Sequence, residues 1–350
     1  MRALLATIAL ASTVLGCSPA APQSTTIKGA PEHATTVSVQ QVMATPVAIP
    51  PAAGNRYFND YILKAVDVIE QNYARRGYDI HSVFTHDLSL GGQIAIPARG
   101  HQPMTMCVAA QMEIMVEALN LYIDERPELA DARRQEVLQY LPNVAWTSLH
   151  PMQLRGQIWV VEELRDLAIG APDINSHGAA DALAHLGMGE TIDFAHLAPG
   201  AFINLNRNIN QKGHYTGHGV VFINYIDVHG EDLPAYDAAH VAGFRYYSAQ
   251  GSSTNGGFGY KRGFFAIDPV TSACPPETSD LPRAQIDCGI RRAANQIATG
   301  QMLNPQYWSH TQRDAWFARM EALRQERTRG DVLDHDGTFD GAYYNGDTGG

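Results

Sequence analysis

The chain has no long apolar run, no surplus of basic residues and few cysteines. Its 350 residues include 25 Lys and Arg against 36 Asp and Glu, which gives a formal net charge of −11. No basic stripe appears along it, so the composition argues against a nucleic-acid partner. No segment beyond the N-terminus is apolar over the roughly 20 residues that a membrane-spanning helix needs. The 45% of hydrophobic residues is typical of a globular protein with a substantial core.

The N-terminus has the pattern of an export signal. Arg2 is followed by an apolar run over residues 3–15, which is too short to span a membrane and fits a signal peptide. The sequence VLGC at residues 14–17 resembles the lipobox of bacterial lipoproteins, which implies lipidation of Cys17. The alternative is an ordinary signal peptide in which Cys17 is incidental. Either way we expect an exported protein, and lipidation would anchor it at the periplasmic face of a bacterial membrane.

The three other cysteines have different surroundings. Cys274 and Cys288 flank a polar, proline-rich stretch, and in an oxidising compartment this spacing predicts a disulfide that closes a surface loop. Cys107 takes part in neither lipidation nor this loop. In an exported protein, such a cysteine is either buried and inert or kept as a thiol for chemistry.

Local patterns divide the chain into four parts. Residues 1–17 are the signal peptide, and residues 18–54 are rich in Ala, Pro, Thr, Ser and Gln, which predicts a disordered linker. The folded domain is expected over residues 55–330. The Gly- and Asp-rich residues 331–350 are expected to be a flexible tail.

Helical periodicity comes before strand patterns within the domain. We predict a helix that begins after Pro103 and ends at about residue 124, and further helices over residues 57–73, 128–140, 160–168, 181–186, 290–297 and 312–326. We predict strands over residues 201–205, 217–226, 244–250 and 260–267. Helices followed by three or four strands, which we expect to be antiparallel, predict an α+β fold.

A thiol and an imidazole are both placed at the starts of predicted elements. Cys107 lies in the first turn or two of its helix, where the positive end of the helix dipole favours thiolate. His218 opens an apolar, β-branched strand. An imidazole within hydrogen-bond reach of a thiol lowers the thiol pKa further and can return a proton to a leaving amine. Buried core cysteine and an ordinary strand-end histidine are the alternatives.

The sequence LAPGAFI at residues 197–203, a polar connection, and GHGVVF at residues 217–222 resemble one half of the papain-like NlpC/P60 and CHAP amidases. The resemblance covers about residues 100–265. It implies N-terminal helices packed on a small antiparallel sheet, Cys107 as nucleophile and His218 as base, and cell-wall peptides as substrate. The residues around Cys107 differ from the families' Asp-Cys-Ser-Gly pattern, and Ala201 replaces their acidic residue.

Two further roles follow from this resemblance. The residue that orients the imidazole lies on the next strand, which offers Ser248 and Gln250; Gln250 is favoured because its amide oxygen can accept from a ring N–H. Asp227 is a competitor, but it lies at the far end of the histidine strand, roughly 30 Å away. Gln102 and the backbone N–H of Cys107 are candidate oxyanion donors.

Three weaker patterns have simpler explanations. His214, His218 and His229 could bind zinc, but no helix enforces their spacing. Residues 334–341 resemble a calcium loop without its twelfth-position glutamate, so a flexible tail is preferred. The glycines of residues 256–259 are expected to border a cleft rather than to hold a phosphate.

We therefore predict an exported cysteine hydrolase that cleaves an amide bond in peptidoglycan stem peptides and needs no metal or cofactor. The alternative is a non-catalytic cell-envelope binding or scaffold lipoprotein on the same fold.

Overall fold

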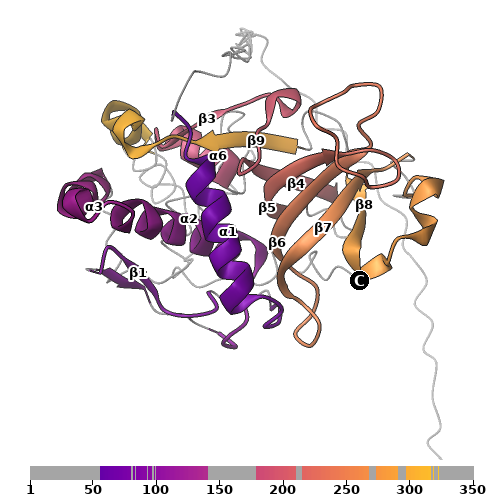
Figure 1. The fold of residues 1–350 in the computed structure, drawn as a ribbon, viewed down its shortest axis with the longest axis horizontal. Helices are drawn as coiled ribbons and strands as arrows, with labels where there is room; N and C mark the ends of the chain where they lie inside the picture. The colour runs from indigo at the N-terminus through magenta and orange to yellow at the C-terminus, as the bar shows by residue number, and fades with distance from the viewer. Residues whose placement is uncertain are drawn as a thin grey trace, which may run out of the picture. The chain divides into compact units, whose positions relative to one another are not determined.

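The fold is organised around one seven-stranded sheet with the strand order β3-β9-β4-β5-β6-β7-β8 (Figure 1). Neighbouring strands are antiparallel, except that β7 and β8 are parallel. The strands are β3 (Gly189–Thr191), β4 (Phe202–Ile209), β5 (Tyr215–Ile226), β6 (Gly243–Gln250), β7 (Gly257–Phe265), β8 (Ile286–Ile290) and β9 (Ile297–Met302).

The computed structural model describes the domain with several gaps. The described residues are 56–79, 82, 84–92, 94–96, 98, 100–140, 179–209, 215–267, 273–290, 297–316, 318 and 322. Cys17, His214, the predicted helix over 160–168, the predicted linker and the predicted tail lie outside them. The described residues all belong to one unit of the chain, Pro46–Gly350.

Helices cover one face of the sheet, and α1, α2 and α3 lie beside it in Figure 1. The described helices are α1 (Asn59–Tyr73), α2 (Cys107–Asp124), α3 (Ala130–Tyr140) and α6 (Ala179–His185). A hairpin of β1 (Leu88–Leu90) and β2 (Ile94–Ile96) forms a separate small sheet. Short 3-10 helices are η1 (Pro127–Leu129), η2 (Phe194–His196), η3 (Pro276–Asp280), η4 (Arg283–Gln285) and η5 (Pro305–Tyr307).

The sheet separates two hydrophobic cores. Side chains alternate between the two faces of a strand, so Val221 and Phe202, which pair across β5 and β4, share the helix-side core. Their neighbours Val220 and Ile203 share the core of the opposite face. The register is regular from Thr216 to Val221, and it therefore determines the direction of the His218 side chain.

The α+β prediction is confirmed at the level of helices packed on a mostly antiparallel sheet. The expected starts and ends of α1, β5 and β6 and the expected end of α2 are correct within about two residues, which is the usual uncertainty of element boundaries. The predicted turn before β4 is also present: Gly200 has a φ of 89°, and a Cβ there would lie 2.7 Å from the Asn59 carbonyl oxygen.

Of the predicted helix over residues 290–297, residues 291–296 lie outside the described residues, and only the two ends can be compared. Its two ends belong to strands, because Ile290 ends β8 and Ile297 begins β9. The strands β3, β8 and β9 were not predicted, so the sheet is larger than the expected three or four strands. These strands have three to six residues each, too few for a period to appear, and pairing with distant strands creates them.

The predicted disulfide is confirmed. Cys274 and Cys288 are bonded, with their Cα atoms 4.8 Å apart. The bond closes the segment that leads into β8, the edge strand of the sheet.

Candidate functional site

His218 lies on β5 and points to the face of the sheet that the helices do not cover. It pairs with Leu205 of β4. Two residues farther along each strand, Val220 and Ile203 also pair, so all four side chains lie on the face of the sheet that the second core covers. Only 4% of its surface is exposed. Its ring lies edge-on to the ring of Tyr246, with centroids 6.0 Å apart. The strand thus holds the imidazole on a rigid element, as predicted.

Cys107 is the first residue of α2, which agrees with its predicted place in the first turn or two, but it is buried in the helix-side core. The preceding Met106 is extended, with a φ of −127° and a ψ of 166°. Cys107 is 1% exposed and is packed in the helix-side core, together with Ala110 and Met106. A thiol at a helix start gains from the dipole, but burial of the Cys107 side chain keeps a substrate in solution from reaching it.

The structure therefore does not bring Cys107 and His218 together. Gly219 faces α2 so closely that a Cβ there would lie 2.5 Å from Oε1 of Gln111. Because successive side chains alternate, His218 points away from α2, while Cys107 lies on the α2 side. The predicted catalytic pair is corrected: the thiol and the imidazole lie on opposite faces of the sheet. The register of β5, which sequence spacing does not reveal, decides this.

The predicted helpers of catalysis have other partners. Gln250 lies on the same face as His218, but its amide oxygen accepts no hydrogen bond from any described residue, and its Nε2 lies 3.5 Å from the Gly259 carbonyl oxygen. The expected bond from the imidazole is therefore not formed. The alternative, Ser248, donates to the Gly219 carbonyl oxygen at 2.7 Å.

Gln102 and Asp227 have local roles. Gln102 is exposed and donates from Nε2 to the Ala98 carbonyl oxygen at 2.8 Å, so its amide does not serve the buried Cys107. Asp227 follows β5 and accepts from the backbone N–H groups of His229 and Glu231, both at 2.9 Å. It closes a turn, as Asp side chains commonly do.

His218 and Gln250 open onto a cleft of about 1130 Å³. Gly256 and the first six residues of β7, Gly257 to Arg262, line it, and the segments at Arg75 and at η4 border it. The predicted role of the glycines at residues 256–259, lining a cleft, agrees with this arrangement. A concave region of this size is typical of a ligand site.

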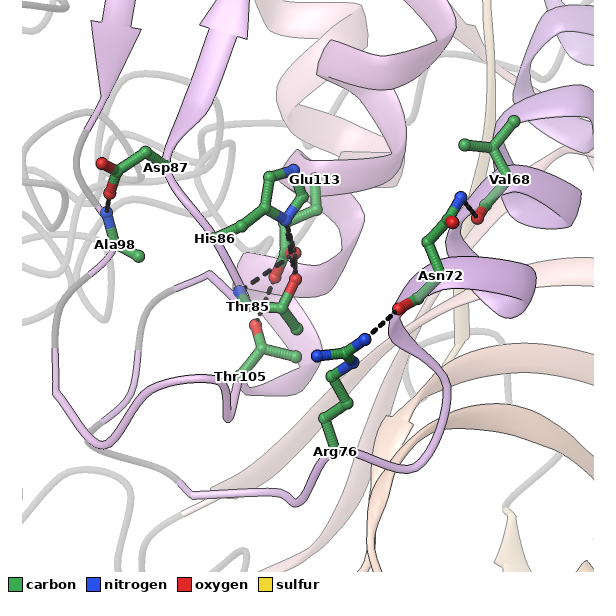
Figure 2. A network of polar contacts seen from close by, with 9 residues as sticks. All are labelled: Val68, Asn72, Arg76, Thr85, His86, Asp87, Ala98, Thr105 and Glu113. Atoms are coloured by element: carbon green, nitrogen blue, oxygen red, sulfur yellow. Dashed lines mark hydrogen bonds and ion pairs between the residues drawn. The ribbon is translucent and has the colours of Figure 1, made fainter.

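A buried carboxylate that the sequence analysis missed lies farther along α2 (Figure 2). Glu113 is 1% exposed. Its Oε2 accepts from the backbone N–H of Thr85 at 3.1 Å and from the Thr85 hydroxyl at 2.6 Å. Its Oε1 accepts from the Thr105 hydroxyl at 2.6 Å. Burial raises the pKa of Glu113 to about 7, against the opposing effect of these three hydrogen bonds.

The Glu113 network extends to His86. The Thr85 oxygen lies 2.8 Å from Nδ1 of His86; while Glu113 is ionised, the hydroxyl proton goes to the carboxylate, so the ring nitrogen donates. Burial lowers the pKa of His86. Phe84, just before Thr85, has a φ of 68°, a conformation that costs energy for a bulky residue. Glu113 thus fastens a strained loop to α2.

One signal could have revealed Glu113. Helix α2 is apolar on nearly all sides, with only three charged residues among 18, and such helices are buried. A carboxylate in its middle therefore needs internal partners, although the sequence does not name them.

The comparisons add no assignment: no family model, no curated protein and no solved structure matches this chain. No helix among the described residues is long and apolar enough to cross a membrane. In the same part of the chain, no group of three or more His, Cys, Asp and Glu residues has a geometry suited to a metal ion.

Proposed function

We propose that this chain is an exported cell-envelope protein that binds a ligand in the His218 cleft without cleaving it. The observation that carries the proposal is the separation of Cys107 from His218 by the sheet. A nucleophile must lie within hydrogen-bond reach of its base, and these two side chains lie on opposite faces of the sheet. The cleft, in contrast, is open to a ligand.

The proposal includes the papain-like ancestry that the sequence suggests. Its support is the element order, with α2 beginning at Cys107 and packed against β5 and β6. The lipid anchor at Cys17 and a peptide or peptidoglycan ligand belong to the same proposal. Their support is the N-terminal sequence and the resemblance to envelope amidases.

A cysteine hydrolase remains the competing function because Cys107 has the helix-start position that activates thiols. That function needs His218 on the other face of β5. A shift of the strand by one residue exchanges the two faces. It would also move Val221 out of the helix-side core and Val220 out of the core on the opposite face.

Purified peptidoglycan decides between the two functions. We expect the protein to co-sediment with sacculi and to release no soluble fragments. Cys107→Ala should bind equally well. Release of fragments by the parent, lost in Cys107→Ala, would overturn the binding proposal in favour of the hydrolase.

A further inference from the structure

The His218 cleft is basic in a chain that is acidic overall. The chain has a net charge of −11. Two carboxylate residues line the cleft, Glu70 and Asp287, against five cationic ones: Arg75, Arg245, Lys261, Arg262 and Arg283. A concave surface with one sign of charge concentrates ligands of the other sign. The cleft therefore favours an anion.

Three of these arginines have no carboxylate partner among the described residues. Arg245 pairs with Asp232 at 2.5 Å. Arg262 donates from Nε to the Gly230 carbonyl oxygen at 2.9 Å. Its terminal nitrogens form no ion pair with Asp or Glu among the described residues. Arg75 and Arg283 form no ion pair with Asp or Glu in the described part. Guanidinium groups without an ion-pair partner match carboxylates of a ligand well, because both groups are planar and can form two parallel hydrogen bonds.

The outer edge of β7 adds a second kind of recognition. Phe258 bridges to Ala74, and its carbonyl oxygen accepts from the Arg75 N–H at 3.2 Å. Farther along, Arg262 pairs with Ile286 of β8. Tyr260 lies between these two contacts. In an antiparallel strand the N–H and C=O groups of every second residue point away from the paired strand, so those of Tyr260 point to the same edge as those of Phe258 and Arg262. Among the described residues, no backbone group pairs with Tyr260 on this side.

The third observation is the amide of Gln250. Its Oε1 is buried and accepts from no described residue, whereas its Nε2 is directed toward the Gly259 carbonyl oxygen at 3.5 Å. Exchanging the two amide atoms would direct Oε1 at a carbonyl oxygen, so the assignment holds. A buried acceptor without a hydrogen bond lowers the stability of the fold. An N–H group of a ligand would supply the missing donor to Gln250 Oε1.

We infer that this cleft binds a short peptide that carries a carboxylate. The inference rests on the proposed binding function and names its ligand class. The carboxylate lies against the arginines, the peptide backbone pairs with Tyr260 as an added strand does, and a peptide N–H reaches Gln250. An anion without N–H groups satisfies only the first of these contacts.

Calorimetry with the full-length protein tests the inference with defined probes. The first is N-acetyl-alanyl-glutamate, and its neutral match is N-acetyl-alanyl-glutamine amide. An N-methylated form of the acidic dipeptide removes the N–H donors, and inorganic phosphate supplies charge alone. We expect the acidic dipeptide to bind at least tenfold more tightly than each of the other three.

Variants of exposed arginines show where the ligand binds. Arg75→Gln and Arg283→Gln should each weaken binding of the acidic dipeptide about tenfold, the effect of losing one charge-assisted hydrogen bond. Arg126→Gln is the matched control, since Arg126 is exposed and lies outside the cleft. It should leave the affinity unchanged.

The opposing results are distinct from those for the proposed function. Equal binding of the acidic and neutral dipeptides, phosphate binding as tight as that of the acidic dipeptide, or no binding of any probe would each overturn the inference. Fragment release from sacculi would instead overturn the proposed function. Co-sedimentation with sacculi, together with a failed dipeptide titration, would leave a binding protein with a different ligand.

Discussion

At the scale of single residues, Glu113 is the most consequential side chain of α2. Its carboxylate joins Thr85 and Thr105 to the helix, and Thr105 comes two residues before Cys107. The same contacts that hold the loop also fix the entrance to the helix. Burial of Glu113 disfavours its charged form, so its effect on stability depends on pH.

We predict that stability falls as pH rises from about 4.5 to about 7. The pKa of Glu113 is about 7 in the folded protein, against 4.5 for an ordinary glutamate in water. Between these values the folded state binds more protons than the unfolded state, so the free energy of unfolding decreases with pH. The full change is about 3 kcal/mol. Urea denaturation at several pH values measures it.

Glu113→Gln should remove most of this pH dependence. At pH 5 it should change stability little, because Glu113 is then protonated and the amide resembles the neutral carboxyl group, with a carbonyl acceptor and a donor. Glu277→Gln is the control, since Glu277 is exposed. If Glu113→Gln retained the pH slope of the parent, another group would have to cause it.

A second residue-scale prediction concerns the Cys107 thiol. Because Cys107 is 1% exposed, we expect it to react with iodoacetamide at neutral pH much more slowly than cysteine in solution. The rate should rise in urea as the domain unfolds. Mass spectrometry of the Cys107 peptide follows the reaction. A rate above that of cysteine in solution, reduced by His218→Ala, would instead indicate an activated thiol.

At the scale of elements, the contact of α2 with β5 depends on one glycine. Gln111 of α2 donates to the Val220 carbonyl oxygen at 3.3 Å and accepts from the Ala179 N–H at 3.2 Å. Its amide occupies the space that a side chain at position 219 would take. The helix and the strand can approach closely only because Gly219 has no Cβ.

Gly219→Ala should therefore destabilise the protein by about 1–3 kcal/mol, as overpacking typically does. The matched substitution Gly259→Ala, on β7, meets no atom within 4 Å and should cost much less. Thermal unfolding of the two variants compares them. Equal losses of stability would mean that the close approach at Gly219 does not govern the docking of α2.

The same contact explains why the candidate site was only partly predictable. The sequence located Cys107 at a helix start and His218 in a strand, since apolar spacing and chain punctuation are local signals. It did not indicate which face of β5 meets α2, because a strand with apolar residues on both faces has no preferred side. Val220 and Val221 are both 0% exposed, in different cores.

At the scale of the whole molecule, the disulfide connects stability with the cleft. Cys274 and Cys288 are separated by 14 residues, and Arg283, Asp287 and Cys288 itself line the cleft. The bond therefore restricts the segment that carries part of the basic surface. Restricting a loop of this length stabilises a fold by about 3 kcal/mol.

Replacing both cysteines by alanine should lower the free energy of unfolding by about 3 kcal/mol. It should also weaken binding of N-acetyl-alanyl-glutamate, because Arg283 loses its fixed position. Denaturation and calorimetry measure the two effects. Reductant is the control: it should destabilise the parent and leave the double variant unchanged. An unaltered affinity would place the ligand away from η4.

The sequence by itself determined the helices α1 and α2, the strands β5 and β6 and the cysteine pair. These features depend on apolar periods over eight or more residues or on loop spacing, both of which are local. Only the tertiary structure decided the short strands β3, β8 and β9, the partners of Glu113 and the side of the sheet on which His218 lies. Each of these depends on pairing between segments far apart along the chain, and the energy of such contacts comes from packing, which no local pattern encodes.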